Sequence, residues 1–442
     1  MTKFLKLLLA TLFLIQILVS TGFELAHDEA YYWLYSQNLA WGYFDHPPLV
    51  GIVIRLFSFL PHSEFSIRIG FIILQFLALF ALFPLLRDKQ DRTTASILYF
   101  SFPLVSFAGL LALPDMPLVF MSALYCLGLN RFLDKKDMTS CLTLAVVIPL
   151  LLYAKYHGIL LVFFTILAIP SLLKEKKFYL IALMSLLLFL PHVWWQYQHD
   201  FSTLRYHFIE RPSSAFSFKR IFEYLGVQLL LAGALAGPLV WWSVLKRPTQ
   251  SQFERAMKFI SVGTIIFFLV SSFSKRVEAN WTIFLAIPLT YLVASSFWWR
   301  TRSGKMLLYT SFFIVLLARL LFLAPADLVK IKRLKEFSGW KEWSMQMDKM
   351  CDGRLVANSY QIASKLSFYL KQEVHSLNYH SRKNQFDYWR FDQKIPSEKV
   401  CYITDKADFL GESIVTPEGK QLKMVRAHSL SELLQRKANS MR

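Results

Sequence analysis

Acidic and aromatic side chains are concentrated in residues 27–49, "HDEAYYWLYSQNLAWGYFDHPPL", directly after the first apolar run of the chain. Asp28 and Glu29 come first, and the aromatic-rich stretch after them is expected to lie flat in a membrane interface as an amphipathic helix. A carboxylate held against such surfaces is partly desolvated, which raises its pKa and makes it a better general base. A helix cap or a solvated loop charge is the alternative role. The pair is therefore a candidate for acid–base chemistry.

A third acid, Asp115, stands between two prolines in "LPDMP". Its alternative role is turn and N-cap chemistry for the helix that follows. If Asp28, Glu29 and Asp115 share one face, they admit a divalent metal site with His46 or His157. Their spacing fits no standard metal motif, so no cofactor is assigned and a divalent metal stays an open alternative.

Basic side chains also stand in loops between apolar runs. Lone cations at a membrane surface usually contact lipid headgroups. Several cations in loops that also carry acids fit another ligand, a phosphate or diphosphate whose charge must be balanced in a restricted space. The candidates are Lys155, Arg205, His207, Arg211, Lys275 and Arg276. Aromatic rings such as Tyr31, Tyr32 and Trp281 offer faces for a sugar ring, although interfacial belts commonly explain single aromatics.

The elements that must position these residues are apolar runs near membrane-spanning length. Hydrophobic residues make up 55% of the 442-residue chain and aromatics 16%, which is typical of an integral membrane protein. In about 30 Å of hydrocarbon such runs must be helices, because no water satisfies their backbone groups. We predict about eleven spans, at residues 4–22, 66–86, 93–112, 117–133, 139–153, 159–173, 178–193, 221–245, 259–273, 282–299 and 306–323.

The distribution of charge predicts the orientation of these spans. Lys and Arg cluster in alternate connections, and the positive-inside rule places those clusters in the cytoplasm. The formal net charge of +19 is therefore topological and indicates no nucleic-acid partner. The run at 4–22 begins like a signal peptide, but it is long for a signal core and no clear Ala-x-Ala site follows it. A retained anchor helix is expected.

An odd number of spans with the amino terminus inside places the C-terminal region and five loops outside. These loops carry nearly all the candidate acids, histidines and cations, whereas the inside loops are plain Lys and Arg connectors. The outside loops are residues 27–48, 113–117, 154–158, 199–212 and 274–281. Polar groups that face one compartment from five separate loops predict one site at one membrane face.

The chain is expected to divide into a membrane part, residues 1–325, and a small α/β domain, residues 326–442. The tail has short strand-like runs, "RLVANS", "EVHSLN" and "KVCYITD", and a helical segment, "SYQIASKLSFYL". Cys351 and Cys401 both belong to this outside region. A disulfide between them is open, because two cysteines alone are weak evidence for a bridge.

Four segments, "DEAYYWLYSQNLAWGYFDHPPL", "LPDMPL", "AKYHG" and "ANW", together resemble the bacterial branch of the dolichyl-phosphate-mannose protein mannosyltransferase superfamily. This superfamily, glycosyltransferase family 39 and its relatives, includes aminoarabinose and lipid A sugar transferases. The resemblance covers about residues 1–325, and its first motif is specific. It implies the GT-C fold and sugar transfer from a polyprenyl-phosphate carrier. It also implies a multi-pass protein of the bacterial inner membrane whose active site faces the periplasm.

Carried over residue by residue, the resemblance makes Asp28 the catalytic acidic residue of the first outer loop, with Glu29 beside it. Asp115 takes the second acidic position. Lys155 and the basic residues of the fourth and fifth outer loops would hold the carrier phosphate. Sugar or acceptor contacts would come from Tyr31, Tyr32, His46, His157, Asn280 and Trp281. A one-step displacement would invert the anomeric centre while the cations stabilise the leaving phosphate.

Two other classes stay open beside the transferase: a multi-span lipid or sugar transporter, including a flippase, and a non-catalytic relative. Transporters usually place charges near the bilayer midplane and often carry internal repeats. Here the polar motifs crowd one face, and no repeat is evident. The expected partners are the lipid-linked donor, a lipid or glycan acceptor and membrane lipids. The sugar and the acceptor, which could be lipid A, lipopolysaccharide, another glycan or a protein, stay undetermined.

Overall fold

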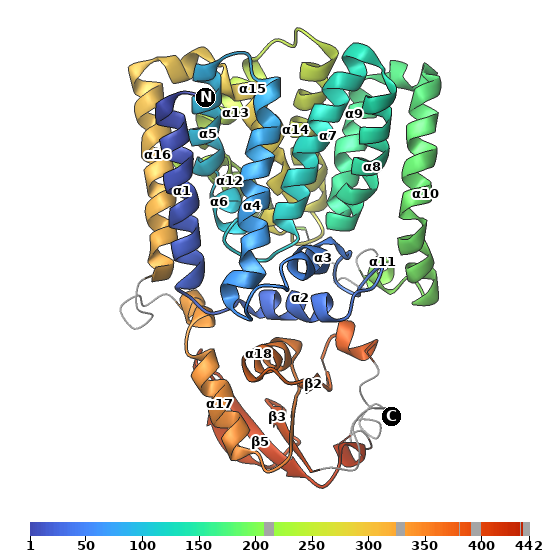
Figure 1. Cartoon of the computed structure of the whole chain (residues 1–442), viewed down its shortest axis with the longest axis vertical. Helices are drawn as coiled ribbons and strands as arrows, with labels where there is room; N and C mark the ends of the chain where they lie inside the picture. Colours follow the sequence, from blue (N-terminus) through green and yellow to red (C-terminus); the bar gives the residue numbers. More distant parts are fainter. Residues whose placement is uncertain (207–215, 324–331, 380, 390–398, 434, 436–442) are drawn as a thin grey trace.

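The computed structural model is a bundle of roughly parallel helices with a smaller C-terminal part, built around a sheet, at one end (Figure 1). It describes residues 1–206, 216–323, 332–379, 381–389, 399–433 and 435. The amino terminus lies at the opposite end of the bundle from the C-terminal part. This arrangement agrees with the predicted placement of the two regions on opposite sides of a membrane. The boundary predicted at residues 325–326 lies outside the described residues.

The predicted spans correspond to helices. They are α1 (Lys3–Thr21), α4 (Glu64–Leu82), α5 (Lys89–Ser101), α6 (Pro103–Ala108), α7 (Asp115–Lys135), α8 (Met138–Ala154), α9 (Ile159–Ala168), α10 (Lys176–Gln198), α12 (Phe218–Leu231), α13 (Gly237–Lys246), α14 (Gln252–Ser271), α15 (Ala286–Ala294) and α16 (Arg302–Leu320). Five in the described chain, α1, α4, α7, α10 and α16, are long and apolar enough to cross a membrane alone. The total of eleven spans stays a prediction.

Two predicted spans are interrupted. The run at 93–112 divides into α5 and α6 at Phe102, because Pro103 begins a new helix and cannot continue the old one. The run at 221–245 divides into α12 and α13, whose axes differ by 116°. Gly233 at this bend has a φ of +128°, a conformation that L side chains rarely adopt. Counted as one span, this bent pair raises the number of candidate spans to six among the described residues.

Burial separates the central helices from the peripheral ones. The spans formed by α4 and α7 are mostly buried, whereas most residues in those of α1, α10 and α16 are partly or fully exposed. On α10 the exposed side chains include Leu183, Leu186, Leu187 and Trp194. Apolar side chains that face outward on a peripheral helix are suited to lipid contact. The bundle therefore presents an apolar perimeter around a packed centre.

Two short helices lie across the end of the bundle near the C-terminal part, α2 (His27–Gln37) and α3 (Leu49–Leu56) (Figure 1). The predicted interfacial helix is therefore present but ends at Gln37. Most of α2 is buried, because it packs on α3 and on α18 (Tyr360–Leu370) of the C-terminal part. Its neighbours are protein rather than lipid headgroups, and the sequence around α2 gives no sign of this cover.

The C-terminal part contains α17 (Trp340–Met350), α18 and five strands. The strands are β1 (Arg354–Ala357), β2 (His375–Ser376), β3 (Val400–Thr404), β4 (Glu412–Val415) and β5 (Gln421–Ala427). Their order is β2-β1-β3-β5-β4. β1 is parallel to β2 and β3, while β5 is antiparallel to β3 and β4. The three predicted strands and the predicted helix are confirmed, and the β4–β5 hairpin was missed.

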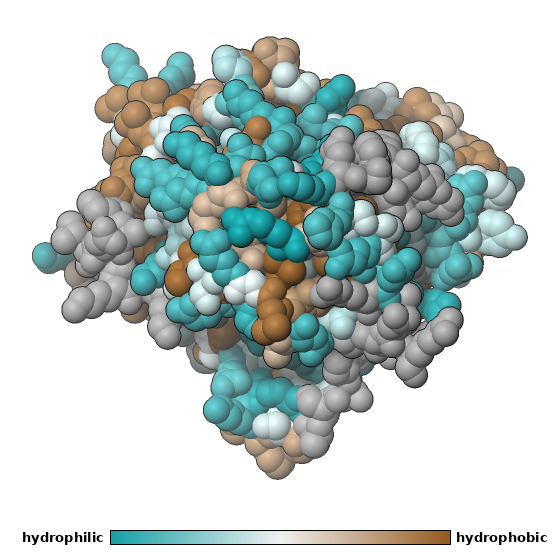
Figure 2. All heavy atoms as spheres, turned by 90° about the horizontal axis from the view of Figure 1, so that it is seen from below, coloured by the Kyte–Doolittle hydropathy of each residue, from teal (hydrophilic) through white to brown (hydrophobic). Residues whose placement is uncertain are grey.

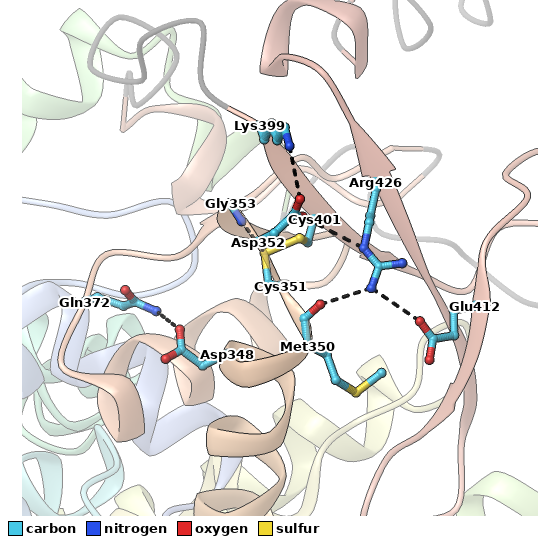
Figure 3. The surroundings of a disulfide bond; sticks show 10 residues. All are labelled: Asp348, Met350, Cys351, Asp352, Gly353, Gln372, Lys399, Cys401, Glu412 and Arg426. Atoms are coloured by element: carbon cyan, nitrogen blue, oxygen red, sulfur yellow. Dashed lines mark hydrogen bonds and ion pairs between the residues drawn. A yellow bond between two sulfur atoms is a disulfide. The ribbon is translucent and has the colours of Figure 1, made fainter.

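A disulfide joins Cys351, directly after α17, to Cys401 in β3 (Figure 3). Charged side chains surround it: Asp352 pairs with Lys399 and Arg426, and Arg426 also reaches Glu412. The bridge therefore fixes α17 against the middle of the sheet. Viewed from the C-terminal end, this part presents a mainly hydrophilic surface, with apolar residues around much of the periphery (Figure 2). Such a surface is suited to water rather than lipid.

The segment between α1 and α2 ties the C-terminal part to the bundle. The Glu24 carboxylate accepts hydrogen bonds from the Trp340 amide at 2.6 Å and the Lys341 amide at 3.2 Å. The Leu25 amide donates to the Tyr369 hydroxyl at 2.9 Å. These bonds attach the C-terminal part immediately before the candidate acids.

A buried ion pair between Glu29 and Arg68 fastens the outer end of the bundle. Arg68 Nη2 lies 2.7 Å from Glu29 Oε2, and neither side chain is exposed. The same carboxylate accepts hydrogen bonds from the Ala26 and Ala112 amides at 2.8 and 2.9 Å. The guanidinium also donates to the carbonyls of Ser20, Phe23 and Glu24. One ion pair therefore connects α1, α2, α4 and the segment that leads into α7.

Replacing Glu29 by Gln should destabilise the protein by about 3–5 kcal/mol, because it leaves the Arg68 guanidinium buried without its counter-charge. The measurement is thermal unfolding of the purified protein in detergent. Glu223→Gln is the matched control, since Glu223 is largely exposed and pairs with Lys219, one helical turn away. An unfolding temperature of Glu29→Gln equal to that of the wild-type protein would contradict the anchoring role.

Candidate functional site

A cavity of about 420 Å³ opens between the end of the bundle and the C-terminal part. Its walls come from α2 and the loop after it, the connection after α8, residue 206, the segment before α15, and the C-terminal part. The lining residues are Asp28, Tyr31, Tyr32, Asp45, His46, Lys155, Tyr156, His157, Tyr206, Glu278, Asn280, Trp281, Tyr360 and Arg382. Four of the five predicted outer loops supply lining residues directly. The remaining loop, residues 113–117, contributes Asp115, which binds the lining residues Lys155 and Asn280.

The structure brings most of the predicted site residues together. Asp28, Lys155 and the six expected sugar or acceptor residues line the cavity, namely Tyr31, Tyr32, His46, His157, Asn280 and Trp281. The described lining does not include Glu29, Arg205, Lys275 or Arg276. Glu29 instead faces Arg68 in the core of the protein. His207 and Arg211 lie outside the described residues.

Asp28 is the carboxylate best placed for proton transfer. It begins α2, and its side chain is accessible from the cavity. The protein surrounds the cavity closely enough that desolvation raises the pKa of Asp28 to about 6, and the charges of Glu336 and Asp45 add to the rise. The charge of His27 and a hydrogen bond from Tyr360 lower the pKa of Asp28. The Tyr360 hydroxyl lies 3.4 Å from Asp28 Oδ1. A base with this pKa is largely ionised at neutral pH.

Lys155 and Asp115 form a second buried ion pair at the cavity wall. Lys155 Nζ lies 3.0 Å from Asp115 Oδ1, and 5% and 4% of the two side chains are exposed. Asn280 donates to the other oxygen, Oδ2, at 3.2 Å. Asp115 is the first residue of α7 and Lys155 directly follows α8, so two helix ends hold the pair. Asp115 therefore orients Lys155 and Asn280 from behind the cavity surface.

Aromatic rings cover much of the remaining wall. The rings of His157 and Trp281 are 4.9 Å apart at an angle of 32°. Tyr31 and Tyr32 face the cavity from α2, and Tyr32 contacts the ring of His46 edge to face. Apolar faces with polar edges suit a sugar ring, whose own faces are partly apolar and whose rim carries hydroxyls.

Several lining residues were missed from the sequence. Asp45 directly precedes His46 in "DHPP", and an acid in that position was a usable signal. Tyr360 and Arg382 come from the C-terminal part, more than 300 residues beyond Asp28, and nothing nearby in the sequence marks them. Arg382 Nη2 lies 2.6 Å from Asp45 Oδ1, and the Tyr31 hydroxyl donates to Asp45 Oδ2 at 2.8 Å.

The acids required by the metal alternative do not meet. Glu29 is held by Arg68, and Asp115 is held by Lys155 and Asn280. Within the described part of the chain, no group of three or more His, Cys, Asp or Glu side chains is placed to hold a metal ion. What the cavity does offer is an accessible carboxylate, a buried ammonium group and an arginine.

Comparisons with known proteins match a family model and a curated relative. The family model for dolichyl-phosphate-mannose-protein mannosyltransferases matches residues 45–195. The lipid A galacturonosyltransferase RgtD of Rhizobium johnstonii is 24% identical over 290 residues, which are 60% of this chain and 60% of that protein. The chain thus matches less than two thirds of this relative.

Two crystal structures of ArnT from Cupriavidus metallidurans share the fold, each at 11% sequence identity. The apo structure has a TM-score of 0.68 and aligns over 96% of this chain and 97% of ArnT. The structure bound to undecaprenyl phosphate has a TM-score of 0.67 over 96% and 98%. These matches confirm the resemblance seen in the sequence: residues 45–195 match the model of the dolichyl-phosphate-mannose-protein mannosyltransferase family, and the chain has the GT-C fold that ArnT also has.

Proposed function

We propose that the protein transfers a sugar from a polyprenyl-phosphate carrier to an envelope acceptor at the outer face of the bacterial inner membrane. The observation that carries this proposal is the cavity itself, where an accessible carboxylate, Asp28, shares one space with the buried cation Lys155. The relative named as a lipid A galacturonosyltransferase and the ArnT structure with bound undecaprenyl phosphate support the acceptor and carrier classes. Lipid A is the first acceptor to test, followed by other envelope glycans and proteins.

Asp28 is the proposed general base. It accepts the proton of the acceptor hydroxyl while that oxygen bonds to the anomeric carbon of the donor sugar. The bond between the anomeric carbon and the phosphate oxygen breaks, and the electron pair leaves with the polyprenyl phosphate. A single displacement of this kind inverts the anomeric centre. Because the pKa of Asp28 is raised, it is a stronger base than an ordinary aspartate while remaining mostly ionised near pH 7.

Lys155 is the proposed ligand of the carrier phosphate. Negative charge accumulates on this phosphate as the glycosidic bond breaks, and a fixed ammonium group in a desolvated place stabilises it. Asp115 and Asn280 hold the lysine, so little reorganisation is needed during the reaction. Arg205, Lys275 and Arg276 are weaker candidates, because the described cavity lining does not include them. The sugar is proposed to rest against Tyr31, Tyr32, His46, His157, Asn280 and Trp281.

The proposed orientation places the cavity outside the cytoplasm. The cavity lies at the same end of the bundle as the C-terminal part, opposite the amino terminus. A disulfide in that part fits an oxidising compartment. We keep residues 1–325 as the membrane domain and 326–442 as the periplasmic domain. A transporter would hold its polar site near the bilayer midplane, whereas this cavity is at the end of the bundle.

Mass spectrometry of envelope lipids and glycans tests the function in cells. A strain that lacks the protein should lose one sugar from one envelope component, and expression of the wild-type protein should restore it. An unchanged set of glycosylated components in the deletion strain, grown where the protein is produced, would count against a transferase.

Asp28→Asn should lower the rate of sugar transfer by about 10²–10⁴-fold, the usual contribution of a general base, because the amide cannot accept the proton. The assay uses purified protein, a polyprenyl-phosphate sugar and the acceptor identified in cells. Asp200→Asn is the control, since Asp200 is an exposed acid in another outer loop. Wild-type turnover by Asp28→Asn would refute the base assignment, and loss of folded protein would support the capping role instead.

The transfer rate at limiting substrate should rise with pH through a midpoint near 6. Asp28 is protonated below its pKa of about 6 and cannot act as a base there. Tyr360→Phe removes a hydrogen bond that lowers this pKa, so its profile should move to higher pH. Tyr197→Phe, at an exposed position on α10, should leave the profile in place. A midpoint near pH 4 would mean that Asp28 behaves as an ordinary surface acid.

A further inference from the structure

The C-terminal part supplies its own side chains to the cavity. Tyr360 enters from α18, and Arg382 enters from the segment after β2. Among the described lining residues, Lys155 and Arg382 are the lysine and arginine side chains. Lys155 belongs to the bundle and Arg382 to the C-terminal part, so the two cations come from different walls.

Arg382 is held on one side and open on the other. Its guanidinium pairs with Asp45 at 2.6 Å, and its carbon Cζ lies 4.8 Å from the centre of the Tyr206 ring. The exposed fraction of the Arg382 side chain is 42%, against 13% for Asp45. The cation is thus positioned by its neighbours while part of it remains accessible to a molecule in the cavity.

This segment contacts the first outer loop at several points besides the Arg382–Asp45 pair. The Gln385 amide donates to the Tyr31 hydroxyl at 2.7 Å, and the Phe44 amide donates to Gln385 Oε1 at 2.8 Å. The rings of Phe44 and Tyr388 also stack at 5.8 Å. These contacts attach the segment to α2 and to the loop after it. The guanidinium is therefore available for a role other than attachment.

We propose that Arg382 binds an oxyanion of a substrate, either the phosphate of the carrier or a phosphate or carboxylate on the acceptor. This proposal rests on the proposed transferase function. An arginine fork has five N–H donors in one plane, so one edge can keep a carboxylate such as Asp45 while another edge holds a second oxyanion.

The charges of the cavity explain why such a cation is needed. The described lining carries the acids Asp28, Asp45 and Glu278, and an incoming anion is repelled by each of them that is ionised. Part of the charge of Lys155 is balanced by Asp115 at 3.0 Å, so a second cation would strengthen the binding of an anion. Arg382 adds positive charge on the wall opposite the bundle, where a phosphate or carboxylate can approach from water. The segment after β2 would thereby take part in choosing the substrate.

Arg382→Gln tests this role in the full-length protein, reconstituted in lipid nanodiscs, with an undecaprenyl-phosphate sugar as donor and lipid A as acceptor. Loss of a charge-assisted contact should raise the KM of one substrate by about tenfold or more. Arg382→Lys keeps the charge without the fork and should fall between wild type and Arg382→Gln. Lys383→Gln, at the exposed neighbouring position, should match the wild type.

The affected substrate identifies the source of the anion. A rise confined to the donor KM assigns Arg382 to the carrier phosphate, and a rise confined to the acceptor KM assigns it to an acceptor anion. Both results support the proposal. Unchanged KM values for both substrates in Arg382→Gln, with normal wild-type turnover, overturn it and leave the transferase function standing.

Asp45→Asn separates ligand binding from packing. If Arg382 only balances the charge of Asp45, Arg382→Gln and Asp45→Asn should raise the KM equally. That result overturns the proposal. If Arg382 binds substrate, Asp45→Asn keeps the cation and its KM should stay at or below the wild-type value. Wild-type protein that neither binds undecaprenyl phosphate, measured as a shift in unfolding temperature, nor transfers sugar overturns this proposal and the proposed function together.

Discussion

The buried pair of Glu29 and Arg68 is the interaction on which the site depends. It joins α2 to α4, and its remaining hydrogen bonds reach the end of α1 and the Ala112 amide. Asp28 is adjacent to Glu29, and Asp115 follows Ala112 by three residues. A single ion pair therefore helps to position Asp28, which lines the cavity, and Asp115, which lies behind its surface. Its desolvation is offset only because the carboxylate and the guanidinium are both surrounded by hydrogen-bond partners.

The second constraint is the closure of the cavity by the C-terminal part. Glu24 and Leu25 bind that part directly before α2, and Gln385 of that part binds Tyr31 in α2 and Phe44 after it. The walls around Asp28 are therefore made by regions far apart in the chain. This closure surrounds the carboxylate with protein and raises its pKa, so the raised pKa of Asp28 follows from the docking of a region that the bundle alone does not contain.

The sequence predicted those features that a single local pattern indicates. Apolar runs located the helices, and the loops that carry polar groups do converge on one cavity. It failed where a role depends on a distant partner. Arg68 lies inside an apolar run, where a charge needs a partner, yet nothing local shows that its partner is Glu29. Arg382 and Tyr360 could not be predicted, because their contribution exists only after the C-terminal part docks.

The adjacent acids Asp28 and Glu29 take different roles because they begin a helix. Successive side chains on an α-helix point about 100° apart, so the two neighbouring carboxylates leave the helix in different directions. Glu29 is the third residue of α2, and its carboxylate turns back to the Ala26 amide and inward to Arg68. Asp28 then necessarily points elsewhere, and the cavity lies on that side. The Glu29 carboxylate therefore anchors the helix, and the Asp28 carboxylate remains accessible from the cavity.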